Sequence, residues 1–473
     1  MSTPRSASLR LPSDVPPLHW WLLLIALLGL AVFVHWVVAV AVFAFALVQR
    51  ARPLDFMTSF MMVMVVGSFI NYGSGALTSQ LSILSLFLVF MLYCYVLARR
   101  WDSLVIPKTV ATVPLLVYGG LTMLNFVRGM AIGNSPRYAG LEILACLALL
   151  SCLLVSSKRL DPREQREAMM WLWAMAFAHF ALGAYIFSII HARTIGVYYT
   201  PVPGLVAMML FNFALRAKTR AKMLLWLLAM GPAIAQQFLS FTRGFWMALI
   251  GGVLFSLIVY VGKSEGAMGR ARRAVWALGV VGGVCLLGIV LLGGALGIHN
   301  VFELAGSRFA SSAGTKYTWE SSSNIVRLVE YFHVLDLIVE QPIFGHGLGY
   351  YFVVREPINF TLLEQWFVHE NYLLVTLKQG LLGLGLWMWL LISIIRMGLR
   401  GRRLPDVYEQ SWCVGVSAVV VYCMVYSLVH FPFAETNTVF TFALCTGVAM
   451  RLTATDVIAL RWKGRRTRPE DVQ

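Results

Sequence analysis

The stretch NYLLVTLKQGLLGLGLWMWLLISIIRMGLRGRR, residues 371–403, decides the fold class of this chain. Residues 371–395 are apolar apart from a few polar side chains, of which only Lys378 carries a charge. A helix of about 20 apolar residues is enough to cross a hydrocarbon core of roughly 30 Å. The run ends in a cluster of arginines, which is typical of a transmembrane helix that ends at the cytoplasmic surface.

Runs of the same kind recur along the chain from Leu18 to Leu452. Hydrophobic residues make up 59% and charged residues 13% of the 473 positions, whereas a globular domain has about half and about a quarter. The composition excludes an ordinary soluble domain and predicts an all-α fold, a polytopic membrane helical bundle of about 12–14 transmembrane helices. The run over 19–48 is long enough for two short helices. Further spans are expected at about 56–73, 80–98, 109–127, 138–156, 168–190, 199–215, 223–240, 244–262, 274–297, 371–395, 410–430 and 436–453.

Lysine and arginine residues are concentrated on one side of this arrangement. Placing the N-terminus in the cytoplasm puts 29 of the 38 basic residues in cytoplasmic loops and tails. The positive-inside rule then sets the orientation, with both termini cytoplasmic and an even number of crossings. Because the net charge of +16 lies in short clusters between apolar runs, it reflects topology and predicts no nucleic-acid partner.

This topology divides the chain into five segments. They are a cytoplasmic N-terminal tail (1–17), an N-terminal transmembrane bundle (18–297), a polar segment on the far side (298–370), C-terminal transmembrane helices (371–453) and a basic cytoplasmic tail (454–473). The N-terminal apolar run is too long for a signal-peptide core and is expected to be retained.

The polar segment is expected to contain one amphipathic helix, starting near residues 321–324 and ending before Pro342. The helix is expected either to lie at the outer membrane interface or to cap the bundle. Its apolar positions follow helical spacing: Ile325, Leu328, Val329, Phe332, Leu335 and Ile338. The opposite face carries Arg327, Glu330, His333, Asp336 and Glu340. His333 and His346 are expected at the surface or in turns.

Arginines that remain on the far side of the membrane are candidates for ligand binding. Arg243 lies in a tight turn between two spans, Arg193 lies just before another span, and Arg327 lies in the amphipathic helix. A guanidinium offers a planar donor fork that suits phosphate oxygens. Each arginine could instead extend to lipid phosphate or pair with a nearby carboxylate, and for Arg327 that carboxylate would be Glu330.

Titratable groups at the membrane boundary complete the candidate site. His369 lies where the polar segment re-enters the membrane, and an imidazole there could be a general base or simply an interfacial hydrogen-bonding residue. Glu370 and His430 are further candidates for binding a diphosphate or a glycan, and Glu435 lies in the same outer turn as His430. Glu142 and Lys378 lie nearest a span interior, where a charge faces a cavity or a partner.

Metal and cofactor chemistry find no support in the sequence. The chain has no HExxH, no Walker-type phosphate loop and no Asp-x-Asp pair on a loop. The seven cysteines all lie in apolar runs without paired spacing. We therefore expect no metal site and no cofactor, and any glycosyl donor is expected to be lipid-linked.

Several of these elements occur in an order that resembles the O-antigen ligase and polymerase family of bacterial envelope glycosyltransferases. The order is Thr242-Arg243-Gly244 between two spans, Arg327 in an outer helix, the sequence PIFGHGLG over 342–349, and then His369 with Gly380 and Gly383 in a His-x10-Gly-x2-Gly pattern. The resemblance covers the helical topology and about 150 residues from Arg243 onward. In ligases the residue after the histidine is usually Asn, Ser or Gln, whereas here it is Glu370, followed by Asn371.

The resemblance implies a function and a place for it. It implies a metal-independent, inverting transfer of a glycan from undecaprenyl diphosphate to an acceptor hydroxyl on the periplasmic side of a bacterial inner membrane. Arg243 and Arg327, supported by Arg193, would bind the diphosphate, and His369 would orient or deprotonate the acceptor. The acceptor would be lipid A-core for a ligase or a second lipid-linked glycan for a polymerase, and membrane lipids would surround the protein.

A transporter or lipid-linked glycan flippase is the alternative from another class. Such a protein also has about twelve spans, and a basic cavity would suit its substrate. It should show two related halves or broken spans in matching positions. We find no such internal symmetry in the sequence, and nearly all of the charge lies at the ends of the spans.

Overall fold

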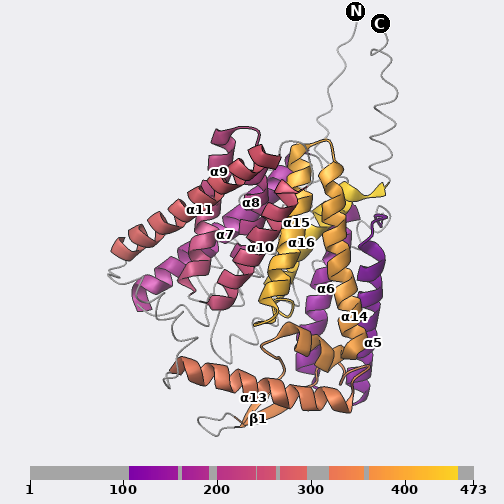
Figure 1. Ribbon diagram of the computed structural model, residues 1–473. Coiled ribbons are helices and arrows are strands. Elements are labelled where there is room, and N and C mark those ends of the chain that lie inside the picture. The colour runs from indigo at the N-terminus through magenta and orange to yellow at the C-terminus, as the bar shows by residue number, and fades with distance from the viewer. Residues whose placement is uncertain are drawn as a thin grey trace, which may run out of the picture. The chain divides into compact units, whose positions relative to one another are not determined.

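The computed structural model (Figure 1) describes residues 106–157, 162–190, 200–240, 242–262, 267–295, 319–355 and 362–455. These residues form long helices and one short hairpin. The spans expected before residue 106, Arg193 and the two terminal tails lie outside the described residues.

Every span expected from residue 109 onward corresponds to a helix. The helices are α5 (Thr112–Ala131), α6 (Pro136–Ser157), α7 (Pro162–Ile190), α8 (Val202–Leu215), α9 (Arg220–Leu239), α10 (Arg243–Val261), α11 (Ala267–Ala295), α13 (Trp319–Glu340), α14 (Asn371–Arg400), α15 (Val407–Tyr426) and α16 (Thr436–Thr453). Of these, α5, α6, α10 and α14, the last counted on to Arg403, are long and apolar enough to cross a membrane. The predicted all-α membrane bundle is confirmed.

The centre of the bundle is α8, in which every residue is buried. Its sequence, VPGLVAMMLFNFAL, is apolar on all sides, and such a helix is stable only when other helices surround it. Helices α9 and α15 pack against it. Its one polar side chain, Asn212, donates a 2.9 Å hydrogen bond to the hydroxyl of Ser256 on α10, so the buried amide is satisfied within the bundle.

The amphipathic helix expected in the polar segment is α13, which begins two residues before the predicted start. Figure 1 shows α13 lying crosswise at one end of the bundle, transverse to α10, α15 and α14. Most of the predicted apolar face is exposed, with Leu328 54% and Phe332 62% accessible, whereas Glu330 on the predicted polar face is fully buried. Helix α13 therefore packs through its Glu330 and Val334 side, which the sequence did not single out.

A short antiparallel hairpin, which the sequence did not predict, lies against α13. Its strands are β1 (Phe352–Arg355) and β2 (Leu362–Gln365), paired with Phe352 opposite Gln365. The hairpin, α13 and the start of α14 share a small core of buried residues: Val334, Phe352, Val354, Val368, Leu374 and Leu377. We call residues 319–370 the cap segment, and this core attaches it to the first turns of α14.

Helix α14 is broken at Gly380, whose φ of 70° and ψ of −174° are not helical. The break frees backbone groups, and the sequence over 342–347 pairs with them. His346 and Gly347 donate to the carbonyls of Leu377 and Lys378 at 2.8 and 2.9 Å, while Leu381 donates to the carbonyl of Pro342 at 2.8 Å. Irregular backbone inside a membrane protein persists only when such partners satisfy it.

The two intramembrane charges, Lys378 and Glu142, pair with each other. The Lys378 ammonium lies 2.7 Å from the Glu142 carboxylate, and both side chains are at least 91% buried. Glu142 also accepts from the Gly349 amide at 2.7 Å, and Lys378 donates to the Tyr350 carbonyl. The pair thus joins α6, α14 and the glycine-rich turn, as expected for a buried charge that needs a partner.

Candidate functional site

Three helix ends meet at the end of the bundle where α13 lies. The Asn371 amide at the start of α14 donates to the Ser427 carbonyl at the end of α15, at 2.9 Å. The start of α10 approaches the same place, since a Cβ on Gly244 would lie 2.5 Å from a methyl group of Val429. Only glycine allows this approach without displacing α15. The junction brings the residues before α14, before α10 and after α15 to one end of the bundle.

His369 is fixed at this junction by Glu330 of α13. The imidazole Nδ1 lies 2.6 Å from one carboxylate oxygen, and the backbone amide of His369 donates to the other at 3.2 Å. The Glu330 side chain is fully buried, whereas that of His369 remains 26% exposed. The ring also contacts Phe367 edge-on, with centroids 5.4 Å apart. The imidazole is therefore held at one nitrogen and one edge while part of it stays accessible.

The Phe431 ring lies near the imidazoles of both His430 and His369. The Phe431 ring centroid is 4.4 Å from that of His430 and 6.4 Å from that of His369. Burial lowers the pKa of His430 well below its usual value, and the charges of His369 and Arg327 lower it further. His430 is thus a neutral imidazole near neutral pH, and its Nδ1 accepts a 2.7 Å hydrogen bond from the Phe431 amide.

Arg327 belongs to the same cluster. Its charge lowers the pKa of His430. Burial raises the pKa of Tyr331, the charge of Arg327 lowers it, and the charges of Glu330 and Glu370 raise it further. Arg327 also lies one turn before Glu330 on α13, and Glu330 contacts His369. Of the predicted site residues, the structure brings Arg327, His369 and His430 together.

Arg243 is the first residue of α10 and is half-buried. It directly precedes Gly244, which packs against Val429, and Phe245, whose ring stacks on Tyr426 at 4.7 Å. These contacts place the Arg243 backbone beside the turn that carries His430. Arg193, the remaining predicted arginine, lies outside the described residues.

The carboxylates that follow His369 and His430 in sequence lie at the starts of two helices, and that of Glu370 caps its helix. Glu370 precedes α14 and accepts from the amides of Tyr372 and Leu373 at 3.1 and 2.6 Å, and burial raises its pKa. Glu435 precedes α16, and burial raises its pKa to about 8, although a hydrogen bond from Thr438 acts in the opposite direction. A ligand-binding role for Glu370 stays a prediction, while its capping role follows from the geometry.

Sequence reasoning missed the role of Glu330 and did not predict the burial of His346. Glu330 was placed on the polar face of the helix, as a possible ion-pair partner of Arg327, but it is buried against His369. His346 was expected in a turn or at the surface. It does lie in the glycine-rich turn, but it is buried, with its Nε2 2.8 Å from the Leu337 carbonyl and its ring stacked on Tyr350.

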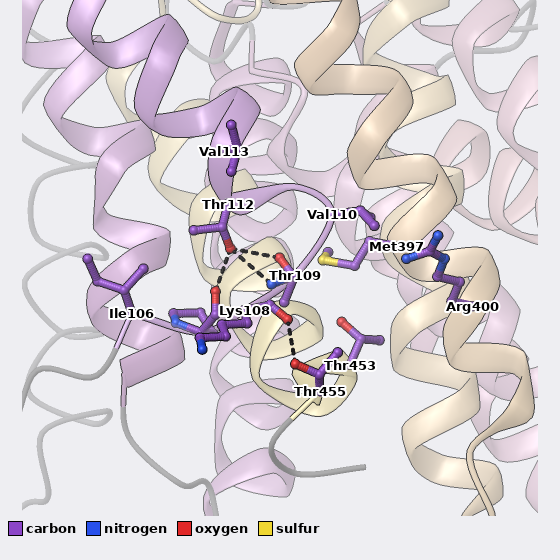
Figure 2. Close-up of a pocket in the computed structure, with 11 residues that line it drawn as sticks. Ile106, Lys108, Thr109, Val110, Thr112, Val113, Met397, Arg400, Thr453 and Thr455 are labelled. Carbon is purple, nitrogen blue, oxygen red and sulfur yellow. Dashed lines mark hydrogen bonds between the residues drawn. The ribbon is translucent and has the colours of Figure 1, made fainter. Parts of the chain in front are cut away.

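A cavity of about 490 Å³ lies at the opposite end of α14 from His369 (Figure 2). It is lined by residues of α5, α14 and the end of α16, among them Lys108, Arg400 and Thr453. Its threonine hydroxyls are used internally, since Thr112 donates to the Pro107 carbonyl at 2.6 Å. This cavity contains none of the predicted site residues, which lie at the other end of the bundle.

Within the described ranges, no three His, Cys, Asp or Glu side chains gather in a way that could hold a metal ion. Metal independence of any reaction stays a prediction. The groups present at the junction are cations, a partly exposed imidazole and buried carboxylates, which suit an anionic ligand and proton transfer.

Comparison with protein families gives one match. Residues 228–388 match the family described as O-Antigen ligase. The matched range includes α10, α13, the cap segment and the first half of α14, and it therefore holds Arg243, Arg327, Glu330 and His369. None of the curated proteins matches the chain. The resemblance found in the sequence is confirmed over this range, which supports an O-antigen ligase-type membrane glycosyltransferase.

Proposed function

We propose that this chain, with an O-antigen ligase domain over residues 228–388, transfers a glycan from undecaprenyl diphosphate to an acceptor hydroxyl on the periplasmic side of a bacterial inner membrane. The observation that carries the proposal is the gathering of Arg327, His369 and His430 at one end of the bundle, inside or beside the matched range. A lipid-linked donor reaches such a site from the bilayer, and an acceptor reaches it from the cap side.

The proposed chemistry divides between the cations and the imidazole. Arg327 and Arg243 bind the diphosphate and stabilise the negative charge that develops on it as the glycosidic bond breaks. His369 takes the proton from the acceptor hydroxyl while the oxygen attacks the anomeric carbon from the opposite side, which inverts its configuration. The bonding electrons leave with undecaprenyl diphosphate. Two fixed cations then do the electrostatic work that a divalent metal does in other transferases.

The test is transfer from a purified undecaprenyl-diphosphate-linked glycan by the protein in detergent, with a chelator present. We expect His369→Ala to lower the rate about 10²- to 10⁴-fold, the usual contribution of a general base. Arg327→Ala and Arg243→Ala should each lower it about 10²- to 10³-fold. His333→Ala and Arg137→Ala are the matched controls, because both residues lie outside the junction, and both variants should retain wild-type rates.

The products separate the two acceptor classes. A ladder of glycan lengths on undecaprenyl diphosphate would identify a polymerase, whereas a single addition to lipid A-core would identify a ligase. Unchanged rates in the His369 and Arg243 variants would contradict the roles proposed for these residues. No transfer by the wild-type protein to either acceptor would contradict the proposed function and favour a transporter. Counterflow of the lipid-linked glycan in proteoliposomes would then be the measurement to make.

A further inference from the structure

We infer that Glu330 is the positioning residue of the transferase site: it fixes the tautomer and orientation of His369 so that Nε2 faces the acceptor hydroxyl. The inference rests on the proposed function and extends it to a residue of α13 that touches neither substrate. Both oxygens of this fully buried carboxylate are used by His369, one by the backbone amide and one by the imidazole.

The tautomer follows from the hydrogen-bonding capacity of each group. A carboxylate is acceptor-only, so the proton of the 2.6 Å contact lies on Nδ1 of His369. A neutral imidazole carries one N–H, and therefore Nε2 has the free lone pair that a general base needs. The opposite tautomer would present an N–H to the acceptor and could not take its proton.

The surroundings of Glu330 explain why its charge can be buried. A buried carboxylate is stable only when it is paired and hydrogen-bonded. His369 supplies both hydrogen bonds. The Arg327 guanidinium lies three positions earlier on the same helix, and its charge and that of Glu330 both affect the pKa of Tyr331. When His369 takes the proton, the resulting imidazolium lies against the carboxylate and is stabilised by it. The 26% exposed ring then releases the proton to solvent.

The bidentate contact also sets the direction of the ring. One oxygen holds the backbone of His369 and the other holds its side chain, so rotation about the side-chain bonds would break the second hydrogen bond. Phe367 and Phe431 contact the ring edge-on. With Nδ1 turned to α13, Nε2 is the nitrogen left for a substrate.

The decisive variant is Glu330→Gln. Its amide keeps one oxygen for the His369 backbone, but its NH₂ donates to Nδ1 and so favours the tautomer with a proton on Nε2. We expect kcat to fall about 10²- to 10⁴-fold with the donor KM unchanged. The matched control is Asp336→Asn, which removes an exposed carboxylate from the same helix and should leave kcat and KM at wild-type values.

A double-mutant cycle separates positioning from a general structural role. If Glu330 acts through His369, Glu330→Gln should have no further effect on the residual rate of a His369→Ala protein. A loss that multiplies in the double variant, or wild-type kcat in Glu330→Gln, would overturn the inference. Should the Gln variant fail to fold, Glu330→Asp keeps the charge on a shorter side chain and should lower kcat at least tenfold, and wild-type kcat there would overturn it equally.

These outcomes are distinct from a failure of the proposed function. Transfer by the wild-type protein together with full activity of the Glu330 variants removes only the positioning role. Absence of transfer by the wild-type protein, with donor and both acceptors present, contradicts the proposed function and the positioning role with it.

Discussion

Replacing Gly380 by alanine should destabilise the protein more than adding a methyl group at any other position of α14. The residue has φ near 70° with extended ψ, a region that is essentially restricted to glycine. A Cβ at this position would lie 2.0 Å from the Ile343 carbonyl oxygen and 2.5 Å from the Phe344 nitrogen. Both contacts are with backbone, which cannot move aside as a flexible side chain can.

The magnitude follows from two contributions. Holding alanine in this conformation costs about 1–3 kcal/mol. Displacing residues 342–344 would also weaken the hydrogen bonds from Leu381 to Pro342 and from Leu382 to Ile343, each of which contributes about 0.5–1.5 kcal/mol. We therefore expect Gly380→Ala to lower the free energy of unfolding by about 2–6 kcal/mol.

A thiol-reactive fluorophore provides the assay. Five of the seven cysteines are buried, so their labelling during heating in detergent reports the loss of helix packing. Gly385→Ala is the matched control, because Gly385 lies in the helical part of α14 and a Cβ there meets no atom within 4 Å; alanine should stabilise it by about 0.5–1 kcal/mol. Equal transition temperatures for Gly380→Ala, Gly385→Ala and the wild type would refute the argument.

Three further changes test other parts of the structure. Lys378→Met should cost about 3–5 kcal/mol by leaving the Glu142 carboxylate buried without its cation, and Glu142→Gln combined with Lys378→Met should recover part of that loss in the same thermal assay. Glu435 has a pKa raised to about 8 in the folded chain, so it binds its proton more tightly when folded; its contribution to stability is complete below pH 4.5 and is lost as pH rises through 8. Glu435→Gln should therefore reduce the fall in transition temperature between pH 7 and 9, and an unchanged fall would contradict the assignment. Arg128→Ala should destabilise by about 1–2 kcal/mol, because Arg128 donates to the carbonyls of Phe344 and Gly345 at 3.0 and 2.6 Å, whereas Arg137→Ala should be neutral.

The helices were predictable because a membrane span is a local signal. About twenty apolar residues in sequence identify it without knowledge of any partner, and α5 to α11 and α14 to α16 lie where the hydropathy placed them. His369 and Arg327 could be named because they stand at fixed points in an ordered motif. Their proximity to His430 could not be predicted, since it depends on how the ends of α14 and α15 meet.

The face of α13 that packs inward could not be predicted, for a physical reason. The rule that apolar residues turn inward assumes water outside, and for a helix beside a membrane the outside can be apolar as well. Leu328 and Phe332 are accordingly exposed, while Glu330 turns toward a histidine 39 residues away in sequence. Whether a carboxylate can be buried depends on its partner, and nothing local in the sequence around Glu330 identifies His369. The hairpin β1–β2 was missed because four-residue strands carry too little pattern.

The break at Gly380 shifts the structural boundary between the cap segment and the membrane span. By sequence the cap ends and the span begins at residue 371, but residues 371–379 are tied to the glycine-rich turn by the bonds from His346 and Gly347. Residues 371–379 therefore belong structurally with the cap segment, and His369 lies just before them. A chimera that exchanges caps between related transferases should be joined after Gly380. With a junction at 370, the donor of each of these hydrogen bonds would come from one parent and the acceptor from the other, and the imidazole would lose its support.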